Sequence, residues 1–513
     1  MRLKKCVLAG GLCALLAGLT ACATPLPQHD MPPSYAIDVP AQGLLNTYMR
    51  QQPADDLQMS GFYMLDRGVD ALSARLQLID MAQTSIDLQY YIYSGDVTGG
   101  LIADRLLAAA DRGVRVRILL DDIGNSMSDK AVATLDMHEN IELRLFNPVS
   151  VRHTWFKLPS KIVEFGRINN RMHNKLLVTD NLAMITGGRN IGDEYYALSE
   201  LDFQDIDLLG IGPISREASA NFDDFWNSPN AIPASVLYED AEVRTLDRMR
   251  EGLASHREKQ AQRPYIQAME KESFSRDLTE GRLKLYWGRS DWLADPPVKA
   301  DAQSEQNEVP YLARILADHL RDVHSELLIK SAYLIPGDRG VELLGGVVEQ
   351  GADVWMLTNS LATTDVLAVH SSYAAYRVPM LKKGIRLWEL QPMAAKQERP
   401  NTFISDSVAS LHAKSFVFDR YKLFVGSINL DPRSITLNTE AGVMVYQKEL
   451  AERMADLFHR WTADDYAFEL RLGEGDELQW HAEGQEWDRE PEAGRMRRFM
   501  AWMLDWLPIE DQL

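Results

Sequence analysis

Cysteine is almost absent from this sequence, and the positions of the few that occur limit its chemistry. Three cysteines occur among 513 residues, at Cys6, Cys13 and Cys22. Cys6 and Cys13 fall within an amino-terminal segment that is expected to be removed, so Cys22 is the only cysteine that would survive processing. The mature chain is therefore predicted to have no disulfide, no thiol nucleophile and no cysteine-based metal site.

An excess of positive charge is also missing. The formal net charge is −20, and it becomes about −23 when the first 21 residues are left out. A protein that binds nucleic acid non-specifically gains affinity from a positive field that releases counterions, so no nucleic-acid partner is expected. The remaining composition, 46% apolar and 25% charged, is typical of a globular protein, and the length suffices for two substantial cores.

The apolar run at the amino terminus is short. It extends from Val7 to Leu19 behind Arg2, Lys4 and Lys5, whereas a permanent transmembrane helix needs about 20 apolar residues. A basic start followed by a short apolar stretch is typical of a secretory signal. Residues 1–21 are therefore predicted to be a signal peptide.

The end of this segment predicts a lipid anchor. Leu19-Thr20-Ala21-Cys22 resembles the lipobox of bacterial lipoproteins, in which the cysteine becomes the lipidated first residue; an ordinary cleaved signal is the alternative. The resemblance implies a membrane protein of the bacterial cell envelope, anchored through Cys22 and facing the periplasm, and Ala23 favours the outer membrane. Residues 22–55, proline-rich and without periodicity, are predicted to be a tether and entry segment.

The remainder of the chain reads as two similar halves. In the first half, apolar or alternating runs at 85–93, 114–122 and 141–148 precede a polar motif. In the second half, similar runs at 325–336, 351–360 and 385–392 precede a copy of that motif about 240 residues later. Short runs of this kind separated by helical periods predict an α/β fold made of two repeated domains, each a mixed β-sheet flanked by helices on both faces.

The repeated motif is long enough to exclude coincidence. Both copies read H-x-K-x-x-x-x-D-x-x-x-x-x-x-G-[GS]-x-N. A single H-x-K with a later aspartate would be weak, because short patterns occur freely in long chains. The six matched side chains and two asparagines are His173, Lys175, Asp180 and Asn190 in the first copy, and His412, Lys414, Asp419 and Asn429 in the second.

The residue types favour an anion site over a metal site. Two strands joined by a tight turn would put the histidine and lysine of H-x-K on the same face, and an ammonium group is neither a ligand for a cation nor a tolerable neighbour. Lysine, backbone N–H groups and an asparagine amide are donors for phosphate oxygens, so Asn190 and Asn429 are predicted to bind phosphate without a metal or other cofactor. Two histidines across one phosphate predict covalent catalysis through a phosphohistidine, with the second histidine as acid and base.

Each histidine needs a carboxylate to orient its other ring nitrogen. In the second half the candidate is Glu440, at the start of an apolar strand. In the first half the corresponding strand offers Asp205 or Asp207, and Asp205 is preferred because it precedes the apolar run.

The doubled H-x-K pattern resembles the phospholipase D superfamily. GFYMLDRGVDAL, GGRNIGDEYY, LTNSLATTD and the final LPIEDQL are similar, more closely, to bacterial cardiolipin synthases of the C type. The resemblance implies an active site at the pseudo-twofold interface of the two domains, His173 as nucleophile, His412 as acid and base, and a structural role for Asp180 and Asp419. It also implies transfer of a phosphatidyl group to phosphatidylglycerol from a second phospholipid, with phosphatidylethanolamine as one candidate.

Other functions use the same residues. A hydrolytic phospholipase D that releases phosphatidic acid would differ only in the acceptor that reaches the phosphohistidine, and a non-catalytic lipid-binding protein is the alternative from another class. The sequence predicts no oligomeric state.

The sequence also predicts how the chain divides into domains. We expect a first domain at 56–240, a charged helical linker at 241–310, a second domain at 311–470 and a C-terminal segment at 471–513. The last segment places Phe499, Trp502, Met503 and Trp506 at helical spacing behind three arginines. Such a helix is either interfacial at a membrane or docked on the body.

Overall fold

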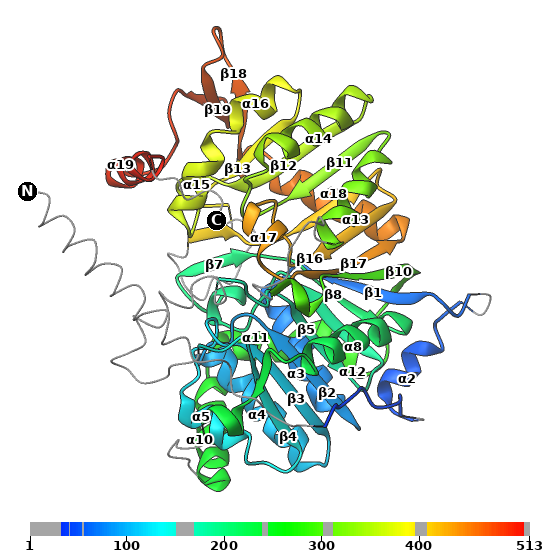
Figure 1. The fold of residues 1–513 in the computed structure, drawn as a ribbon. Helices are drawn as coiled ribbons and strands as arrows, with labels where there is room; N and C mark the ends of the chain where they lie inside the picture. The colour runs from blue at the N-terminus through cyan, green and yellow to red at the C-terminus, as the bar shows by residue number, and fades with distance from the viewer. Residues whose placement is uncertain are drawn as a thin grey trace, which may run out of the picture.

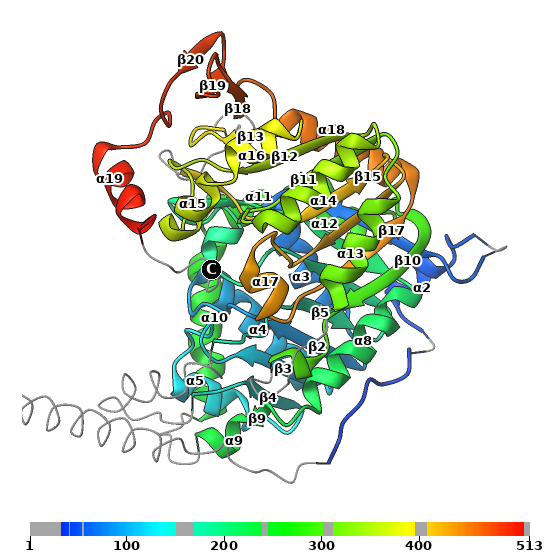
Figure 2. The same ribbon diagram turned by 45° about the horizontal axis from the view of Figure 1, so that its top comes forward.

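The computed structural model describes residues 32–40, 42–53, 56–149, 169–238, 245–300, 311–394 and 408–506. The predicted signal peptide and Cys22 lie outside these residues. The two halves of the chain stand one above the other, and their strands meet in the middle of the molecule (Figures 1 and 2).

The first half is a mixed sheet. Its central strands β2, β3 and β4 are parallel, and the others join them in antiparallel pairs. Parallel neighbours need a crossover connection, which α4 supplies between β2 and β3. The strands are β1 (Ser60–Leu65), β2 (Ser85–Tyr90), β3 (Arg115–Asp121), β4 (Ile141–Phe146), β5 (Lys175–Thr179), β6 (Ala183–Gly187), β8 (Asp207–Ile211) and β9 (Ala231–Pro233).

The second half repeats this order. Strands β11, β12 and β13 are parallel, and a β15–β16 hairpin and β17 follow on one side in the places of β5, β6 and β8. The strands are β10 (Tyr286–Ala294), β11 (Glu326–Lys330), β12 (Asp353–Asn359), β13 (Arg386–Leu390), β15 (Ser415–Phe418), β16 (Lys422–Gly426), β17 (Ala441–Tyr446), β18 (Ala467–Leu472), β19 (Leu478–Ala482) and β20 (Gln485–Trp487). The runs expected at 85–93, 114–122, 141–148, 325–336, 351–360 and 385–392 each contain one of these strands.

One strand joins the two sheets. Residues 286–288 of β10 pair with β1, and residues 289–294 pair with β17. Within the described residues the result is one sheet of 18 strands, and its order is β9-β4-β3-β2-β5-β6-β8-β1-β10-β17-β16-β15-β11-β12-β13-β18-β19-β20. The order reads alike from both sides of the β1–β10 junction, which gives the fold its pseudo-twofold symmetry.

Helices cover both faces of this sheet, as the sequence predicted. One face carries α3 and α4 in the first half and α13 and α14 in the second, whereas α8 and α18 pack on the other face. The helices of the two halves are α3 (Gly68–Met81), α4 (Val97–Asp111), α5 (Asp129–Leu135), α8 (Pro213–Trp226), α9 (Ala234–Leu237), α13 (Tyr311–Arg321), α14 (Gly337–Glu349), α15 (Leu367–Ala374), α16 (Arg377–Lys382), α17 (Pro432–Thr436) and α18 (Lys448–Trp461), with one 3-10 turn, η1 (Asp193–Tyr195).

The segment 241–310 is helical only in part. It contains α10 (Leu246–Ala261), α11 (Pro264–Lys271) and α12 (Ser273–Thr279), and then β10 and η2 (Pro297–Ala300). The expected linker therefore also supplies the strand that joins the halves.

The entry segment is bound to the first half. The amide of Ser34 donates to Asn227 Oδ1 (3.0 Å), and the amide of Ala36 donates to Asp223 Oδ2 (2.8 Å). Further on, α2 (Leu44–Met49) carries the buried Tyr48, whose hydroxyl donates to the carbonyl of Leu278 (2.7 Å).

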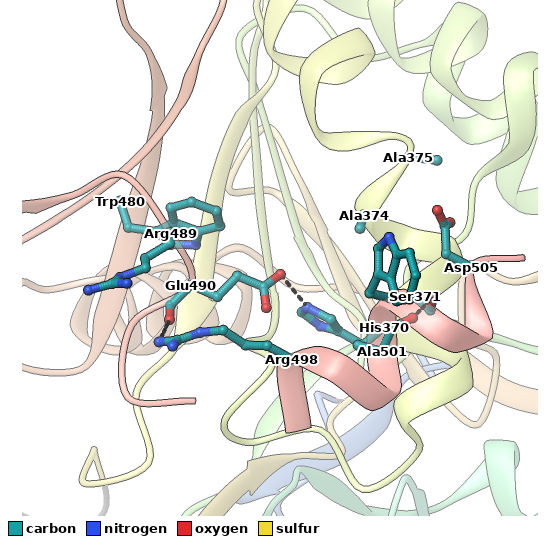
Figure 3. A pocket seen from close by; sticks show the side chains of 11 residues that line it. His370, Ser371, Ala374, Ala375, Trp480, Arg489, Glu490, Arg498, Ala501 and Asp505 are labelled. Atoms are coloured by element: carbon teal, nitrogen blue, oxygen red, sulfur yellow. Dashed lines mark hydrogen bonds and ion pairs between the residues drawn. The ribbon is translucent and has the colours of Figure 1, made fainter. Parts of the chain in front are cut away.

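The last helix, α19 (Arg495–Leu504), lies at the edge of the second half against α15. The hydroxyl of Ser371 donates to the carbonyl of Ala501 (2.8 Å), while a cavity of about 470 Å³ remains between the two helices. Glu490 and His370 face each other there, with Oε1 and Nε2 3.0 Å apart (Figure 3). No helix among the described residues is both long and apolar enough to cross a bilayer.

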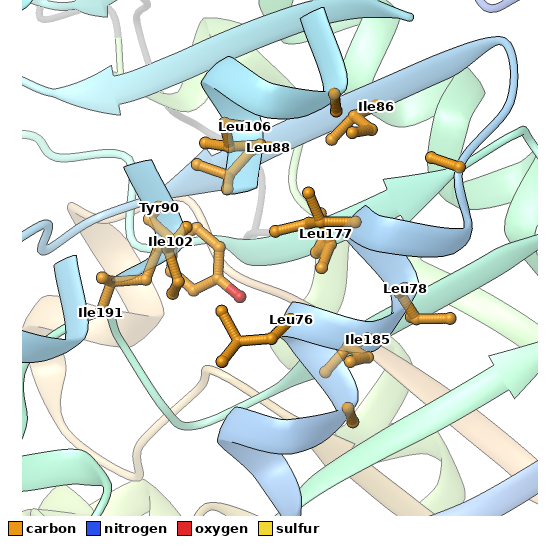
Figure 4. Close-up of a cluster of buried hydrophobic side chains, with 14 of the residues drawn as sticks. Leu76, Leu78, Ile86, Leu88, Tyr90, Ile102, Leu106, Leu177, Ile185 and Ile191 are labelled. Carbon is orange, nitrogen blue, oxygen red and sulfur yellow. The ribbon is translucent and has the colours of Figure 1, made fainter. Parts of the chain in front are cut away.

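The cores follow the strand alternation. Ile86, Leu88 and Tyr90 point from one face of β2 into a cluster with Leu177 of β5 and Leu76 of α3 (Figure 4). Each such side chain contributes about 1.5–3 kcal/mol by leaving water. The opposite face builds a second cluster in which residues of both halves are continuous, including Leu176, Phe225 and Trp226 with Val417, Met454 and Trp461. The two halves are therefore parts of one packed body.

Candidate active site

Each H-x-K motif stands at the entrance of a β-hairpin. Lys175 is the first residue of β5 and Ser415 the first of β15, so each histidine lies just before its strand. Each of the turns that follow contains two residues with positive φ. These are Asp180 (54°) and Asn181 (52°) in the first half, and Asp419 (52°) and Arg420 (51°) in the second. Two positive-φ residues are typical of a type I′ hairpin turn, which matches the twist of the strands and returns the chain to β6 and β16.

The motif aspartates fasten these turns to the start of a neighbouring strand. Asp180 Oδ1 accepts from the amides of residues 83–85 and from the hydroxyl of Thr84, at 2.7–3.2 Å. Asp419 Oδ1 accepts from the amides of residues 324–326 and from the hydroxyl of Ser325, at 2.7–3.2 Å. The two networks are equivalent, and each carboxylate satisfies backbone donors that would otherwise be unpaired.

Each histidine is held by a carboxylate from the other half. Nδ1 of His173 lies 2.8 Å from Glu440 Oε2, and Nδ1 of His412 lies 2.6 Å from Asp205 Oδ2. Both carboxylates are fully buried, and the histidines are 9% and 7% exposed. The structure therefore brings Asp205 and Glu440 to the histidines, as expected, but exchanges them across the pseudo-twofold axis.

Backbone pairing enforces this exchange. The amide of His173 donates to the carbonyl of Thr439, and the amide of His412 donates to the carbonyl of Gln204, both at 2.9 Å. In each case the acceptor directly precedes the orienting carboxylate. A two-stranded parallel pair, β7 (Leu201–Gln204) with β14 (Val408–Leu411), continues the second contact.

Asp207, the other candidate acid of the first half, has a different role. Asp207 Oδ2 lies 2.9 Å from Arg75 Nη2 and 3.4 Å from Arg189 Nη1, and all three side chains are buried. Two guanidinium groups neutralise Asp207, so Asp205 is the acid that reaches a histidine.

The two carboxylates have unequal surroundings. Glu440 Oε2 accepts a 2.5 Å hydrogen bond from the hydroxyl of Ser427. The equivalent residue in the first half is Gly188, where an added Cβ would lie 2.1 Å from Asp205 Oδ1. Serine and the longer glutamate in one half thus correspond to glycine and the shorter aspartate in the other.

The two carboxylates also differ in the direction of their pKa shifts. Burial raises the pKa of Glu440 to about 7, against the opposing charge of Lys175 and the bond from Ser427. Burial also tends to raise the pKa of Asp205, but His412 and Lys414 outweigh it and leave that pKa below its ordinary value. Asp205 is therefore the more strongly ionised of the two carboxylates.

The histidines and lysines form one charge cluster. Burial, then Lys175 and Lys414, depress the pKa of His173 well below its ordinary value. Burial and Lys414, against Asp205, lower the pKa of His412 to about 4, with Lys175 contributing. Burial also lowers the pKa of Lys175 to about 7. Because each lysine acts on both histidines, all four groups share one site.

Aromatic rings surround the imidazoles. Tyr91 lies edge-on to His173 with ring centroids 5.0 Å apart, and Lys175 Nζ is 5.6 Å from the same tyrosine ring. On the other side, Tyr195 and Phe203 lie 5.1 and 4.9 Å from the ring of His412. The motif spacing gave no signal for these rings, and Tyr195 and Phe203 reach His412 from the opposite half.

The asparagines also support the loops around the site. Asn190 Oδ1 accepts from the amide of Ile92 (3.1 Å), and its Nδ2 donates to the hydroxyl of Tyr195 (2.8 Å). Asn429 Oδ1 accepts from the amide of Tyr333 at 3.4 Å. Binding of phosphate by these two asparagines stays a prediction, in which their side-chain nitrogens Nδ2 would be the donors.

A buried ion pair outside the motifs holds Glu440 in place. Asp295 Oδ2 accepts from Lys299 Nζ (2.7 Å) and from the amide of Glu440 (3.0 Å). Both side chains are nearly inaccessible. They follow β10 in the segment expected to be a linker, which is why sequence reasoning missed them. In the portion of the chain with described coordinates, no group of three or more His, Cys, Asp or Glu residues is arranged to hold a metal ion.

Comparison with known proteins places this arrangement in a family. The model of the family described as "Cardiolipin synthase, PLD-like domain" matches residues 76–226 and 316–462. Cardiolipin synthase C of Escherichia coli (strain K12) is 35% identical over 457 residues, which are 88% of this chain and 95% of that protein. The major cardiolipin synthase ClsA of Bacillus subtilis (strain 168) is 26% identical over 76% of this chain and 66% of that protein.

A solved structure supports the fold. The phosphatidylserine synthase of Haemophilus influenzae Rd KW20 superposes with a TM-score of 0.56 at 12% identity, over 91% of this chain and 100% of that one. A duplicated mixed sheet with two H-x-K motifs at its junction defines the class of phospholipase D-like proteins. The chain belongs to the cardiolipin synthase family of that class, which confirms the resemblance seen in the sequence.

The aspartate networks make a prediction about stability. We expect Asp180→Ala to lower the free energy of unfolding by about 3 kcal/mol, because it leaves the buried amide of Ser85 and the partly buried amides of residues 83 and 84 without their acceptor. Asp419→Ala should cost less, since that side chain is only half-buried. Asp180→Asn is the control, because Oδ1 accepts from every donor of the network and an amide oxygen can replace it, so that only the second bond from the amide of Gln83, to Oδ2, is lost. Chemical denaturation measures all three, and equal losses for Asn and Ala would contradict the proposed network.

The raised pKa of Glu440 makes a second prediction. Between its unfolded value of 4.5 and its folded value of about 7 the folded protein binds more protons, so this group's contribution to stability falls as pH rises. Glu440→Gln should therefore become more stable relative to the wild type across that window, by about 3 kcal/mol. Asp205→Asn should show no such trend in this window, because the pKa of Asp205 is lowered from an ordinary value of 3.8 and its contribution to stability changes only below that pH. Denaturation curves between pH 4.5 and 7.5 test the sign, and parallel curves would refute it.

Proposed function

We propose that the protein is a phosphatidyltransferase that forms cardiolipin from phosphatidylglycerol and a second phospholipid. The observation that carries the proposal is the pair of buried histidines, each held by a carboxylate of the opposite half, within a cluster of two lysines. Such a cluster binds one phosphodiester and offers it two imidazoles. The family membership supplies the lipid as substrate class.

In the first step His173 is the nucleophile. Its Nδ1 faces Glu440, so Nε2 is the nitrogen left for substrate. The Nε2 lone pair forms a bond to phosphorus, and the bond from phosphorus to the departing headgroup oxygen breaks. His412 Nε2–H gives its proton to that oxygen, and the headgroup alcohol leaves from a phosphatidyl-histidine.

In the second step the acceptor is a hydroxyl of phosphatidylglycerol. His412 takes its proton, the oxygen attacks phosphorus, and the bond from nitrogen to phosphorus breaks. Lys175 and Lys414 neutralise the non-bridging oxygens in both steps. Asn190 and Asn429 are proposed to donate to those oxygens as well.

The unequal carboxylates support this division of roles. The ionised Asp205 stabilises a protonated His412, as an acid requires, whereas Glu440 with its raised pKa leaves His173 neutral. In the ligand-free site both histidines have lowered pKa values, and an anionic phosphodiester beside them raises those values. Substrate binding therefore supplies the conditions that protonate His412.

The proposal extends to the place of action. A phospholipid substrate puts the reaction at a membrane surface. We also propose that Cys22 carries a lipid anchor, which would hold the protein on the periplasmic side of an envelope membrane, with the outer membrane favoured by Ala23. Mass spectrometry of the mature amino terminus tests the anchor independently of activity.

A substrate with a good leaving group tests the two histidine roles. A phosphatidyl ester of p-nitrophenol needs no acid in the first step, so His412→Ala should accumulate labelled phosphatidyl-enzyme on His173 while turnover falls by roughly 10³-fold or more. His173→Ala should lose turnover and carry no label. Label on His412 in the His173 variant would reverse the assignment, and label in neither variant with active wild type would refute the covalent mechanism.

The products distinguish transfer from hydrolysis. Incubation with labelled phosphatidylglycerol alone, and with phosphatidylethanolamine added, should give labelled cardiolipin with release of glycerol or ethanolamine. Phosphatidic acid as the sole product would indicate the hydrolytic phospholipase D instead. Binding of these lipids without any product would indicate a non-catalytic lipid-binding protein.

A further inference from the structure

Helix α19 has its apolar side facing outward. Six large apolar side chains of this short segment are 42–74% exposed, which is a large share of the exposed large apolar residues in the described parts of the chain. They recur at helical spacing: Met496, Phe499, Met500, Trp502, Met503 and Trp506. A surface helix of a globular protein normally turns such residues toward the core, so α19 is inverted.

The polar side of the helix holds it to the body. Arg497 Nε donates to the carbonyl of Leu361 (2.5 Å), and the same guanidinium donates to the carbonyl of Thr364. Arg498 Nη2 donates to the carbonyl of Glu490 (2.7 Å). These bonds fix the rotation of the helix, so the exposure of its apolar side is set by the structure.

The part of the body that faces α19 across the cavity also carries charged residues. His370 Nε2 lies 3.0 Å from Glu490 Oε1 in the cavity between α15 and α19 (Figure 3). Arg377 Nη1 donates to the same oxygen at 2.8 Å. Burial opposes ionisation of Glu490, but His370 and Arg377 lower its pKa to about 2. Ala374, Ala375 and Trp480 add apolar lining to this cavity, and Trp502 of α19 reaches its edge while staying 56% exposed.

The loop that receives Arg497 leads to the candidate active site. Asp365, next to Thr364, accepts from the hydroxyl of Tyr333 (2.8 Å), and the amide of Tyr333 donates to Asn429 of the second motif. The charge of Asp365 also acts on the pKa of Lys414. The helix is thus attached at the rim of the site.

We propose that α19 is a membrane-docking helix that lies in the interface of a lipid bilayer and presents the active-site rim to that surface. Tryptophan, phenylalanine and methionine on one side are the residues that an interfacial helix inserts, and tryptophan prefers the headgroup level. Arg495 is exposed and adds a positive charge that suits anionic lipid headgroups, whereas Arg497 and Arg498 are bound to the body. The orientation of the site rests on the proposed function, whereas the contact with the bilayer does not.

A fluorescent probe at one position tests the contact. NBD is attached to Met503→Cys in the full chain with Cys6, Cys13 and Cys22 replaced by serine, and the matched control carries it at Met137→Cys, since these methionines are 52% and 54% exposed. Vesicles of phosphatidylcholine with about 30% phosphatidylserine are added. We expect a blue shift and stronger emission at position 503 and no change at 137.

Three results would overturn the contact. Unchanged emission at 503 while the protein floats with the vesicles would place the bilayer elsewhere. A blue-shifted signal before lipid is added would mean that another segment of the chain covers the helix. A signal that shifts with protein concentration in the absence of lipid would assign the apolar side to a second copy of the chain.

A second experiment tests the orientation of the site. We expect the triple variant Phe499→Ser, Trp502→Ser, Trp506→Ser to lower turnover of vesicle-borne phosphatidylglycerol by roughly tenfold, and to leave turnover of a detergent-dispersed short-chain lipid unchanged. The control triple variant is Tyr35→Ser, Leu57→Ser, Met137→Ser, in which three comparably exposed residues elsewhere are removed. An equal fall with both substrates would show a structural role for the helix and refute the proposal. If the wild type turns over neither lipid, the proposed function fails while the NBD result still decides the membrane contact.

Discussion

Two buried carboxylates, each bonded to a histidine of the opposite half, are the interaction on which this structure depends. The site buries Lys175, Lys414, Asp205 and Glu440 together. Burial of isolated charges is costly, and removal of one partner from such a cluster leaves an uncompensated charge. Because the histidine and the carboxylate of each pair come from different halves, neither half satisfies its own motif. The continuous sheet through β10 and the core shared by α8 and α18 hold the halves at the spacing that this exchange requires.

The duplication is symmetric in backbone and asymmetric in chemistry. The two aspartate networks and the two backbone bonds to Thr439 and Gln204 are equivalent. The differences lie in the side chains that face the carboxylates, where serine with glutamate in one half replaces glycine with aspartate in the other. A phosphoryl transfer in two steps needs one neutral and one protonated imidazole, and two identical halves would not favour either. In the proposed mechanism, small departures from symmetry therefore separate the roles of the two histidines, while the repeated backbone directs both toward one phosphate.

Much of the fold and most of the site followed from the sequence, because both depend on local patterns. The parallel strands read as apolar runs, and the H-x-K hairpins repeat with the same spacing, so the α/β class and the six motif residues were predictable. The choice of Asp205 over Asp207 also followed, but its reason appears only in space, where Arg75 and Arg189 neutralise Asp207. The exchange of carboxylates between halves, the bond from Glu440 to Asp295, and the rings of Tyr195 and Phe203 against His412 could not be predicted, since each joins segments that are distant in the sequence.

The free site is poised for an anion. Burial and like charge lower the pKa of both histidines, and burial lowers the pKa of Lys175 to about 7. The cluster therefore carries less positive charge than the same residues would carry in water. An anionic phosphodiester compensates that charge and stabilises the protonated forms, which makes substrate binding and proton uptake one event. The same low exposure that depresses these pKa values also strengthens the attraction of the lysines for phosphate. In the proposed mechanism such a site stays weakly charged until its substrate arrives, and His412 becomes the acid only when there is a leaving group to protonate.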